Sequence, residues 1–285
     1  MNFHQQSNSI LTGSTSGGLW VWPLENARSG GQRLKGHAAA LRHVRVEKAA
    51  GGHVSRLVTA GDDHWIGVWD LRQRRALVRK LLGHSDKITS VTVDAARSTI
   101  VSGSRDKTLR TWDLRTGRAR IIMKGHLGAV QSVVGDGVHG VISAGCDSTV
   151  KVWDADGKCE RTMRGHDAKV NAVELPTVMP FGAQGMGRVA SASSDETVRV
   201  WNCATGRCLR LLRGHRAPVT CIGWPTPGRL VSGATDGRIK LWDLRSGLCE
   251  RNYIGHTRPV TCLECHPAAI ISGSADGSVR IWKVE

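Results

Sequence analysis

Residues 83–113 decide the fold, and they read GHSDKITSVTVDAARSTIVSGSRDKTLRTWD. Short runs in this stretch alternate apolar and polar residues, as in Thr108–Trp112. An alternation with a period of two is typical of β-strands, because successive side chains of a strand point to opposite faces of a sheet. Asp106 and Lys107 stand between two such runs and supply turn residues. The stretch therefore predicts short strands joined by tight turns.

The same pattern recurs along the whole chain. Gly-His pairs at matching positions of the repeat begin at Gly36, Gly83, Gly125, Gly165, Gly214 and Gly255, with spacings of 47, 42, 40, 49 and 41 residues. An alternating run ends on a Trp in seven places: Trp22, Trp69, Trp112, Trp153, Trp201, Trp242 and Trp282. A repeat of about 40 residues with four strands cannot bury both faces of its sheet alone, so the units must stack as blades.

The combination of Gly-His, the Ser-Gly-Ser-x-Asp run at 102–106 and the Trp-Asp pair at 112–113 resembles the WD40-repeat (Gβ-like) family, and the resemblance covers the whole chain. It implies an all-β fold, a seven-bladed WD40 β-propeller. It also implies that residues 1–285 form a single propeller domain whose blade units end at the seven Trp residues. Some resemblance extends to the propellers of F-box–WD40 ubiquitin-ligase receptors.

The resemblance further implies that an N-terminal strand completes the last blade. The last unit here stops at Trp282–Glu285, and Phe3–His4 align in phase with Cys265–His266, near the end of a first strand. We therefore expect an N-terminally truncated chain whose closing strand is missing, to be supplied by upstream residues or by a partner. Open strand edges are expected along Val279–Lys283 and Ile10–Ser14, and such edges invite association.

Each full unit contains a His, a Ser or Thr, an Asp and a Trp at matching positions. Ser, His and Asp can build a nucleophile, but an enzyme needs one such set and this chain has six. The family resemblance assigns them to buried hydrogen-bond chains that hold each blade together. We therefore expect no catalytic residue, no enzyme, and structural tetrads at His37, Thr59, Asp63, Trp69; His84, Ser102, Asp106, Trp112; His126, Ser143, Asp147, Trp153; His166, Ser191, Asp195, Trp201; His215, Ser232, Asp236, Trp242; and His256, Ser272, Asp276, Trp282.

The cysteines do not predict a cofactor. Cys262–His266 spells the c-type haem attachment pattern, but it lies in a predicted strand equivalent to 220–224, with Cys262 at the core position of Cys221. The other cysteines fall on different blades without a second paired motif, so zinc is not expected either. The 8 Cys lack the density of a disulfide scaffold, which favours the cytoplasm or nucleus. No secretory signal and no run of 18 apolar residues is visible, so no membrane contact is expected.

Charge is the strongest compositional signal. The chain carries 40 Lys+Arg against 24 Asp+Glu, a formal charge of +16. Such a balance is typical of polyanion binding, but charged outer strands also protect sheet edges in solution. The basic run from Arg72 to Lys80 contains no aromatic residue on which a base could stack. The sequence leaves open whether the charge binds an acidic or nucleic-acid partner or only solvates the edges.

A candidate partner-binding face follows from the repeat. The Gly-His loops and the Asp turns are expected at the same end of the blades, which in the family is the usual peptide-binding face. Arg42 and Arg105 match positions at which F-box–WD40 receptors hold phosphorylated degrons, and the planar guanidinium fork suits phosphate. The positions matching Arg42 elsewhere hold Thr89, Gln131, Asn171, Thr220 and Thr261. Four further cations keep this face positive: Lys87, Lys169, Arg216 and Arg258.

The sequence therefore predicts a non-catalytic scaffold that binds peptide or protein partners on the Gly-His/Asp face. One alternative is a substrate receptor of a cullin-type ubiquitin ligase that reads acidic or phosphorylated segments. Another is an RNA-associated scaffold of a ribonucleoprotein. Trp65 and Trp224 lie outside the repeated Trp position and are candidate contact residues. Two insertions, Arg45–Arg56 and Glu174–Arg188, are expected to be loops between the first and second strands of their units.

Overall fold

The computed structural model describes residues 2–4, 9–23, 32–48, 54–70, 77–94, 98–135, 140–176 and 187–284 of the chain. The side chains of 2–4, 9–12, 22–23, 46–48 and 54–55 lie outside the described part, and with them the predicted position of Trp22. Within these ranges every regular element is a β-strand.

The strands of the described residues form seven antiparallel sheets, six with four strands and one with three. The first thirteen strands are β1 (Asn2–His4), β2 (Ser9–Gly13), β3 (Leu19–Pro23), β4 (Gln32–Leu34), β5 (Leu41–Lys48), β6 (Val54–Gly61), β7 (Trp65–Trp69), β8 (Leu77–Leu82), β9 (Ile88–Asp94), β10 (Thr99–Ser104), β11 (Thr108–Asp113), β12 (Ala119–Lys124) and β13 (Val130–Gly135). The rest are β14 (Val141–Gly145), β15 (Val150–Trp153), β16 (Cys159–Met163), β17 (Val170–Glu174), β18 (Arg188–Ser193), β19 (Val198–Asn202), β20 (Cys208–Leu212), β21 (Val219–Thr226), β22 (Arg229–Ala234), β23 (Ile239–Asp243), β24 (Cys249–Tyr253), β25 (Val260–His266), β26 (Ala269–Ser274) and β27 (Val279–Lys283). This arrangement confirms the predicted fold class, a seven-bladed β-propeller of the WD40 type.

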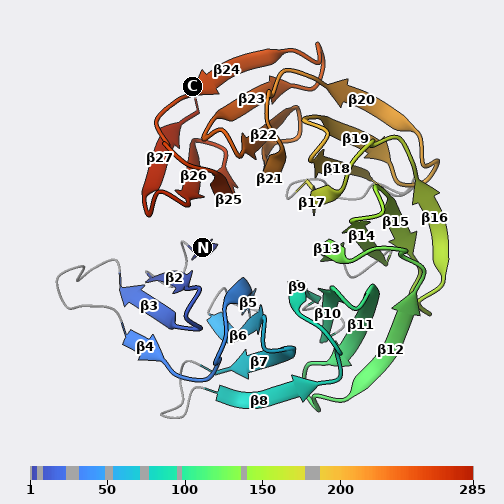
Figure 1. The fold of residues 1–285 in the computed structure, drawn as a ribbon, viewed down its shortest axis with the longest axis vertical. Helices are drawn as coiled ribbons and strands as arrows, with labels where there is room; N and C mark the ends of the chain where they lie inside the picture. The colour runs from blue at the N-terminus through green and yellow to red at the C-terminus, as the bar shows by residue number, and fades with distance from the viewer. Residues whose placement is uncertain are drawn as a thin grey trace. The chain divides into compact units, whose positions relative to one another are not determined.

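The chain forms two compact units, residues 1–141 with 155–158 and residues 142–154 with 159–285. In the first unit, the first strands β5, β9 and β13 gather on one side and the fourth strands β4, β8 and β12 on the other (Figure 1). In the second unit, β17, β21 and β25 lie opposite β16, β20 and β24. Within each unit the first strands of neighbouring sheets contact each other: β9 packs on β5 and β13 in the first unit, and β21 packs on β17 and β25 in the second.

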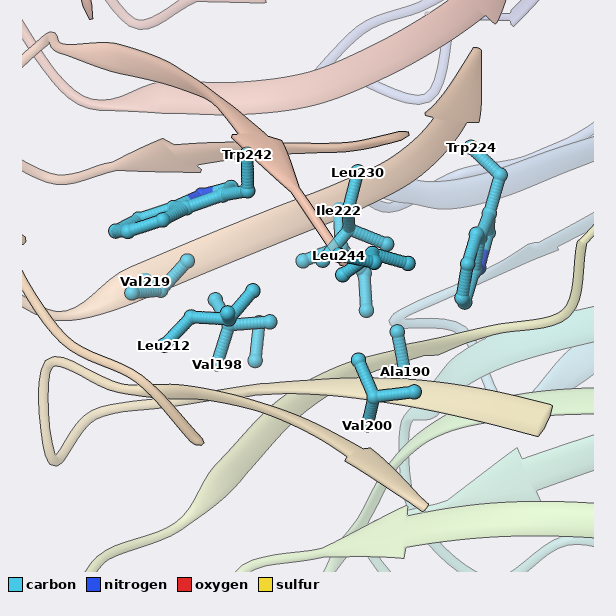
Figure 2. Close-up of a cluster of buried hydrophobic side chains, with 11 residues drawn as sticks. Ala190, Val198, Val200, Leu212, Val219, Ile222, Trp224, Leu230, Trp242 and Leu244 are labelled. Carbon is cyan, nitrogen blue, oxygen red and sulfur yellow. The ribbon is translucent and has the colours of Figure 1, made fainter. Parts of the chain in front are cut away.

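Apolar side chains fill the space between successive sheets. Figure 2 shows the cluster between the sheets β17–β20 and β21–β24, with Trp242 at one end and Trp224 at the other. Val198, Leu212 and Leu230 lie between them, each at most 1% exposed. The alternation seen in the sequence therefore places one face of each strand against the neighbouring sheet, which supplies the main stabilisation of the blades.

Small residues at two repeated positions make this packing fit. A Cβ on Gly103 of β10 would lie 2.6 Å from Val130 Cγ1 and 2.8 Å from Val133 Cγ1 on the next first strand. A Cβ on Gly36, the glycine of a Gly-His pair, would lie 2.4 Å from Cη2 of the Trp69 ring. These close approaches explain why the repeat keeps Gly before His and a small residue in the second strand.

The Asp of the Trp-Asp pair ends the third strand and stabilises the turn that follows. The Asp113 carboxylate accepts hydrogen bonds from the amides of Arg115 (2.9 Å) and Thr116 (2.7 Å). Gly117 then adopts a φ of 77°, which a side chain would strain. Asn202 makes the same contact with the Thr205 amide in the sheet β17–β20, at 2.9 Å.

Three expectations need correction or restriction. The insertion Arg45–Arg56 is not a loop throughout, because β5 and β6 pair as far as Lys48 and Val54, and only 49–53 fall outside the described residues. The predicted open edge at Ile10–Ser14 is wrong for Ile10 and Leu11, because these residues pair with Phe3 and Asn2 of β1. Of the insertion Glu174–Arg188, residues 177–186 lie outside the described part.

The last sheet has three strands among the residues that the structure describes. Ile281 of its third strand is 71% exposed, whereas Leu241 at the matching position of β23 is 1% exposed and packs in a cluster with Val260 and Ile270 of the next sheet. In the described residues β27 pairs with β26 alone and ends the sheet, which agrees with the predicted edge along Val279–Lys283.

We predict that Gly103→Ala destabilises the chain by about 1–3 kcal/mol, because the new Cβ overpacks the valines of β13. The control is Gly228→Ala, since a Cβ on Gly228 meets nothing within 4 Å and should change stability by less than about 0.5 kcal/mol. Urea unfolding measures both, and equal losses in the two variants would contradict the packing account.

Candidate functional site

The repeated His, Ser and Asp residues form buried hydrogen-bond chains. In the sheet β9–β12, the His84 ring lies 2.7 Å from Asp106 through Nδ1 and 2.8 Å from Ser102 Oγ through Nε2. The Trp112 indole donates to the same Ser102 Oγ at 2.9 Å. An ionised carboxylate only accepts, so Nδ1 carries the proton, and Ser102 donates to Nε2. The chain of donors therefore runs from Trp to Ser to His to Asp.

Three other sheets repeat these contacts in the described residues. The first distance is from His Nδ1 to Asp, the second from His Nε2 to the hydroxyl, and the third from Trp Nε1 to that hydroxyl. They are 2.8, 2.7 and 2.7 Å for His37, Asp63, Thr59, Trp69; 2.7, 2.8 and 2.7 Å for His166, Asp195, Ser191, Trp201; and 3.0, 2.7 and 2.8 Å for His256, Asp276, Ser272, Trp282. Trp153 likewise donates to Ser143 at 2.8 Å, and the His126 ring is buried.

A hydroxyl two residues after the Asp holds the carboxylate in place. Thr197 donates from its hydroxyl (2.7 Å) and its amide (2.9 Å) to Asp195 Oδ1, which leaves Oδ2 for His166. Thr108, Thr149 and Ser278 make the same hydroxyl contact with Asp106, Asp147 and Asp276 at 2.6 to 2.7 Å. Burial alone would raise the pKa of Asp195, but the hydrogen bonds from Thr197 and His166 outweigh it and lower this pKa to about 2. The carboxylate is therefore ionised at neutral pH.

The sheet β5–β8 replaces the hydroxyl with an aromatic ring. Trp65 stacks on His37 with ring centroids 3.8 Å apart and planes 6° from parallel, and Lys80 Nζ lies 4.4 Å from the Trp65 ring. Trp65 is 7% exposed, so it is a packing residue rather than a contact for partners. Trp224 is also buried, at 3% exposure, and its indole donates to the Glu174 carbonyl at 3.1 Å.

The sheet β21–β24 breaks the pattern. His215 Nε2 lies 2.7 Å from Ser232 Oγ, but the buried Nδ1 of His215 has no hydrogen-bond partner among the described residues. Asp236 turns instead toward Arg238, with 3.9 Å between Arg238 Nε and Asp236 Oδ2. Arg238 occupies the position of the hydroxyl in the other sheets. Burial first, and then the Lys240 charge, lower the pKa of His215 to about 4, and the charge of Asp236 only partly offsets them.

Two of the predicted partner-binding cations are already paired. Arg42 Nε and Nη2 donate to the two oxygens of Asp62 at 2.7 and 2.9 Å, and Lys87 Nζ donates to the same carboxylate at 2.8 Å. The hydrogen bonds from Arg42 hold the pKa of Asp62 well below its usual range. Asp62 therefore neutralises half of the charge that Arg42 and Lys87 would present to a phosphate.

The other predicted cations, Arg105, Lys169, Arg216 and Arg258, are exposed. Arg105 lies in the first unit with Arg42 and Lys87, and its amide donates to the Lys87 carbonyl at 2.9 Å. Lys169, Arg216 and Arg258 belong to the second unit. Within the described residues, no ion pair involves these four side chains.

The positions that match Arg42 have a role that the sequence did not reveal. Thr89 Oγ1 donates to the Val130 carbonyl at 2.6 Å, and Asn171 Nδ2 donates to the Val219 carbonyl at 2.7 Å. Thr220 makes the same bond to the Val260 carbonyl. Each bond links the first strand of one sheet to the first strand of the next. The series Thr, Asn, Thr at one position was the available signal, because each of these short side chains can donate to a carbonyl.

The Cys262–His266 motif lies in β25, as predicted. All eight cysteines are free, and burial raises the pKa of the Cys221 thiol to about 12. Among the described residues, no group of three His, Cys, Asp or Glu side chains is placed to hold a metal ion. No helix that could span a membrane occurs in the part of the chain that the structure describes.

Comparison with known proteins identifies the repeat. The profile described as "WD domain, G-beta repeat" matches residues 75–113, 117–154, 157–202, 206–243 and 247–283. The chain belongs to the WD40 family. WD40 repeats form scaffolds for protein interactions.

Several curated WD40 relatives are nuclear distribution proteins. Nuclear distribution protein PAC1 of Arthroderma benhamiae is 37% identical over 153 residues, covering 52% of this chain and 33% of the relative. PAC1 of Gibberella zeae is 36% identical over 141 residues, covering 47% of this chain and 31% of the relative. Nuclear distribution protein nudF 1 of Talaromyces marneffei is 32% identical over 294 residues, covering 78% of this chain and 61% of the relative. The chain thus spans about a third of the length of the first relatives.

We predict that Asp195→Asn destabilises the WD40 chain by about 1.5–3 kcal/mol, because it weakens a charged hydrogen bond to a buried ring. The matched variant Asp236→Asn should change stability by less than about 0.5 kcal/mol, because Asp236 does not contact His215. Urea unfolding at pH 7 measures both, and similar losses would show that Asp236 does bind its histidine.

We predict that Arg238→Thr stabilises the chain at pH 7 by about 1 kcal/mol, because the new hydroxyl returns Asp236 to His215. The pKa of His215 is about 4 in the folded chain and about 6.5 when unfolded. The unfolded state therefore takes up the proton first, and stability is lost as the pH falls from 6.5 to 4. Arg238→Thr should raise the folded pKa and make this loss smaller.

The measurement is urea unfolding at several pH values between 4 and 7. Arg245→Thr removes the same charge from an exposed turn at the other end of β23 and should follow the wild type. Parallel curves for Arg238→Thr and Arg245→Thr would refute the role given to position 238.

Proposed function

We propose that the protein is a non-catalytic scaffold that binds protein partners on the Gly-His/Asp face, the surface formed by the Gly-His loops and the Asp turns. The observation that carries the proposal is that four of the Gly-His loops in the described residues are bonded to their Asp turns. The amides of Ala38, Ser85, Asp167 and Thr257 donate to the Asp carboxylate of their sheet at 3.1 to 3.2 Å. Such loops are ordered before a partner arrives, so that binding costs less conformational entropy.

The tetrads supply this rigidity and do not suit catalysis. Ser102, Ser191 and Ser272 are 0% exposed, and each accepts a hydrogen bond from a Trp indole. A hydroxyl that no solvent molecule reaches cannot attack a substrate in this state. His, Ser and Asp side chains build a nucleophile in other proteins, but here they serve as hydrogen-bond partners of one another inside the blades.

The exposed cations favour acidic protein segments as partners. Arg105, Lys169, Arg216 and Arg258 project from the Gly-His loops and Asp turns without a carboxylate partner among the described residues. The receptor interpretation, in which Arg42 and Arg105 hold a phosphate, is less well supported because Asp62 already occupies the Arg42 guanidinium. The relatives named nuclear distribution proteins also favour a scaffold.

Affinity capture with the full chain tests the proposal. Arg105→Glu with Lys169→Glu should remove captured partners, because each substitution reverses the charge of an exposed residue in an Asp turn or a Gly-His loop of its own unit. Arg118→Glu with Arg207→Glu is the matched control, since these exposed residues lie in the turns at the opposite ends of β11 and β19. The control should capture the same partners as the wild type. Equal capture by both double variants would overturn the assignment of this face.

A further inference from the structure

Among the described residues, the turn of Asp236 lacks two contacts that Asp63, Asp106, Asp195 and Asp276 make. In four sheets the Asp carboxylate accepts from both the His ring and the next amide, as Asp276 does from His256 (3.0 Å) and from the Thr257 amide (3.1 Å). In the sheet β21–β24, Asp236 makes neither bond. His215 is 5% exposed, and its Nδ1 has no partner in the described part of the chain. An oxygen of Asp276 thus lies beside Nδ1 of His256, whereas no oxygen of Asp236 lies within hydrogen-bond distance of Nδ1 of His215.

Only the side chain of Asp236 differs, because the turn backbone is formed as usual. The Gly237 amide donates to the Ala234 carbonyl at 3.2 Å, as the Gly277 amide donates to Ser274 at 3.1 Å. Asp236 Oδ1 still accepts from the Arg238 amide at 3.0 Å. The Asp236 carboxylate can therefore adopt two arrangements that share this Oδ1 bond. In one, Oδ2 points toward Arg238, and in the other it would point toward His215.

We propose that Arg238, together with Arg216 and Arg258, binds the carboxylates of an acidic protein segment, and that this binding returns Asp236 to His215. The inference rests on the proposed function and specifies its partner chemistry at one blade. Arg238 is 53% exposed, and the 3.9 Å separation from Asp236 is long for an ion pair. An exposed pair of this kind contributes little, so an acidic ligand can replace Asp236 at small cost.

The three arginines belong to adjoining loops of one unit. Arg216 follows His215 directly, and Arg238 follows Gly237. A Cβ on Gly237 would lie 2.5 Å from the His256 carbonyl and 3.2 Å from the Arg258 carbonyl, so the turn packs on the loop that carries Arg258. The Thr235 amide also donates to the Pro218 carbonyl at 2.9 Å. Asp236 is the one carboxylate that pairs with these arginines in the described residues.

The surroundings favour an acidic peptide over a nucleic acid. Trp242 and Tyr253, the aromatic rings of this sheet nearest the turn, are 1% and 7% exposed, so neither offers a surface for base stacking. The groups that act on His215 are Asp236 and Lys240, and Lys240 already donates to Asn252 Oδ1. Returning Asp236 to His215 therefore satisfies Nδ1 without freeing another buried charge.

Coupling between ligand and histidine works in both directions. A ligand that brings Asp236 to His215 raises the pKa of His215, and protonation of His215 then strengthens binding of the ligand. The experiment uses the full chain and N-acetylated, C-amidated hexaglutamate, with hexaglutamine as the neutral peptide. Calorimetry gives the Kd at pH 7.5 and 5.5, and imidazole NMR follows His215.

We expect wild type to bind hexaglutamate but not hexaglutamine, more tightly at pH 5.5, with a shift of the His215 signals on binding. Arg238→Thr should weaken binding by at least about fivefold. Arg245→Thr removes the same charge and should weaken it by less than about twofold, which separates a site from the general attraction of a +16 chain. Asp236→Asn should bind hexaglutamate without the pH dependence and without the His215 shift.

Equal weakening by Arg238→Thr and Arg245→Thr would overturn the proposal, as would binding that leaves the His215 signals of the wild type unchanged. Inorganic phosphate is the second probe. If it shifts the His215 signals with the same dependence on Arg238, a free anion rather than an acidic peptide is the ligand, and the proposal fails. These outcomes leave the scaffold function standing, because its capture experiment changes Arg105 and Lys169 and does not involve this turn.

Discussion

Six of the seven sheets in the described residues depend on a buried imidazole that needs a hydrogen-bond partner for each ring nitrogen. A polar atom buried without a hydrogen bond costs about 1–3 kcal/mol, so a repeat that buries a His must also place a hydroxyl and a carboxylate beside it. The Ser or Thr, the Asp and the Trp meet this requirement in a single chain of donors. Because the His lies in a loop and the Asp in a turn, the same bonds fix the surface that carries the exposed cations.

The variations between blades follow from how the carboxylate is held. Where Thr or Ser stands two residues after the Asp, one oxygen is bonded locally and the other is left for the ring. In the sheet β5–β8, Trp65 stands at this position and stacks on His37. Both oxygens of Asp63 lie within 2.9 Å of Nδ1 of His37, so the ring still has its carboxylate partner. Arg238 neither donates a hydroxyl to the carboxylate nor stacks on the histidine. The Asp236 carboxylate turns toward Arg238 and away from His215. One substitution at a repeated position thus turns a structural carboxylate into part of an exposed charged surface.

The sequence predicts the fold well because its signal is repeated. The spacing of Gly-His, Asp and Trp defines the blades, and the alternation within each run defines the faces of the strands. Single positions are harder to predict. Nothing in the sequence indicates that Asp62 pairs with both Arg42 and Lys87, since these residues approach only after three different segments have folded. The departure at Arg238 is visible in the sequence, but its effect on His215 depends on side-chain geometry. The links made by Thr89, Asn171 and Thr220 likewise need the neighbouring sheet in place.

The most direct test of the central claim is long-range ¹H–¹⁵N NMR of the imidazole rings at neutral pH. The account predicts that His84, His166 and His256 carry a proton on Nδ1 and show the strongly deshielded signal of an Nδ1 proton hydrogen-bonded to a carboxylate. It predicts that His215 lacks this proton signal in the free chain. A deshielded Nδ1 proton on His215 equal to that of the other three rings would contradict the account.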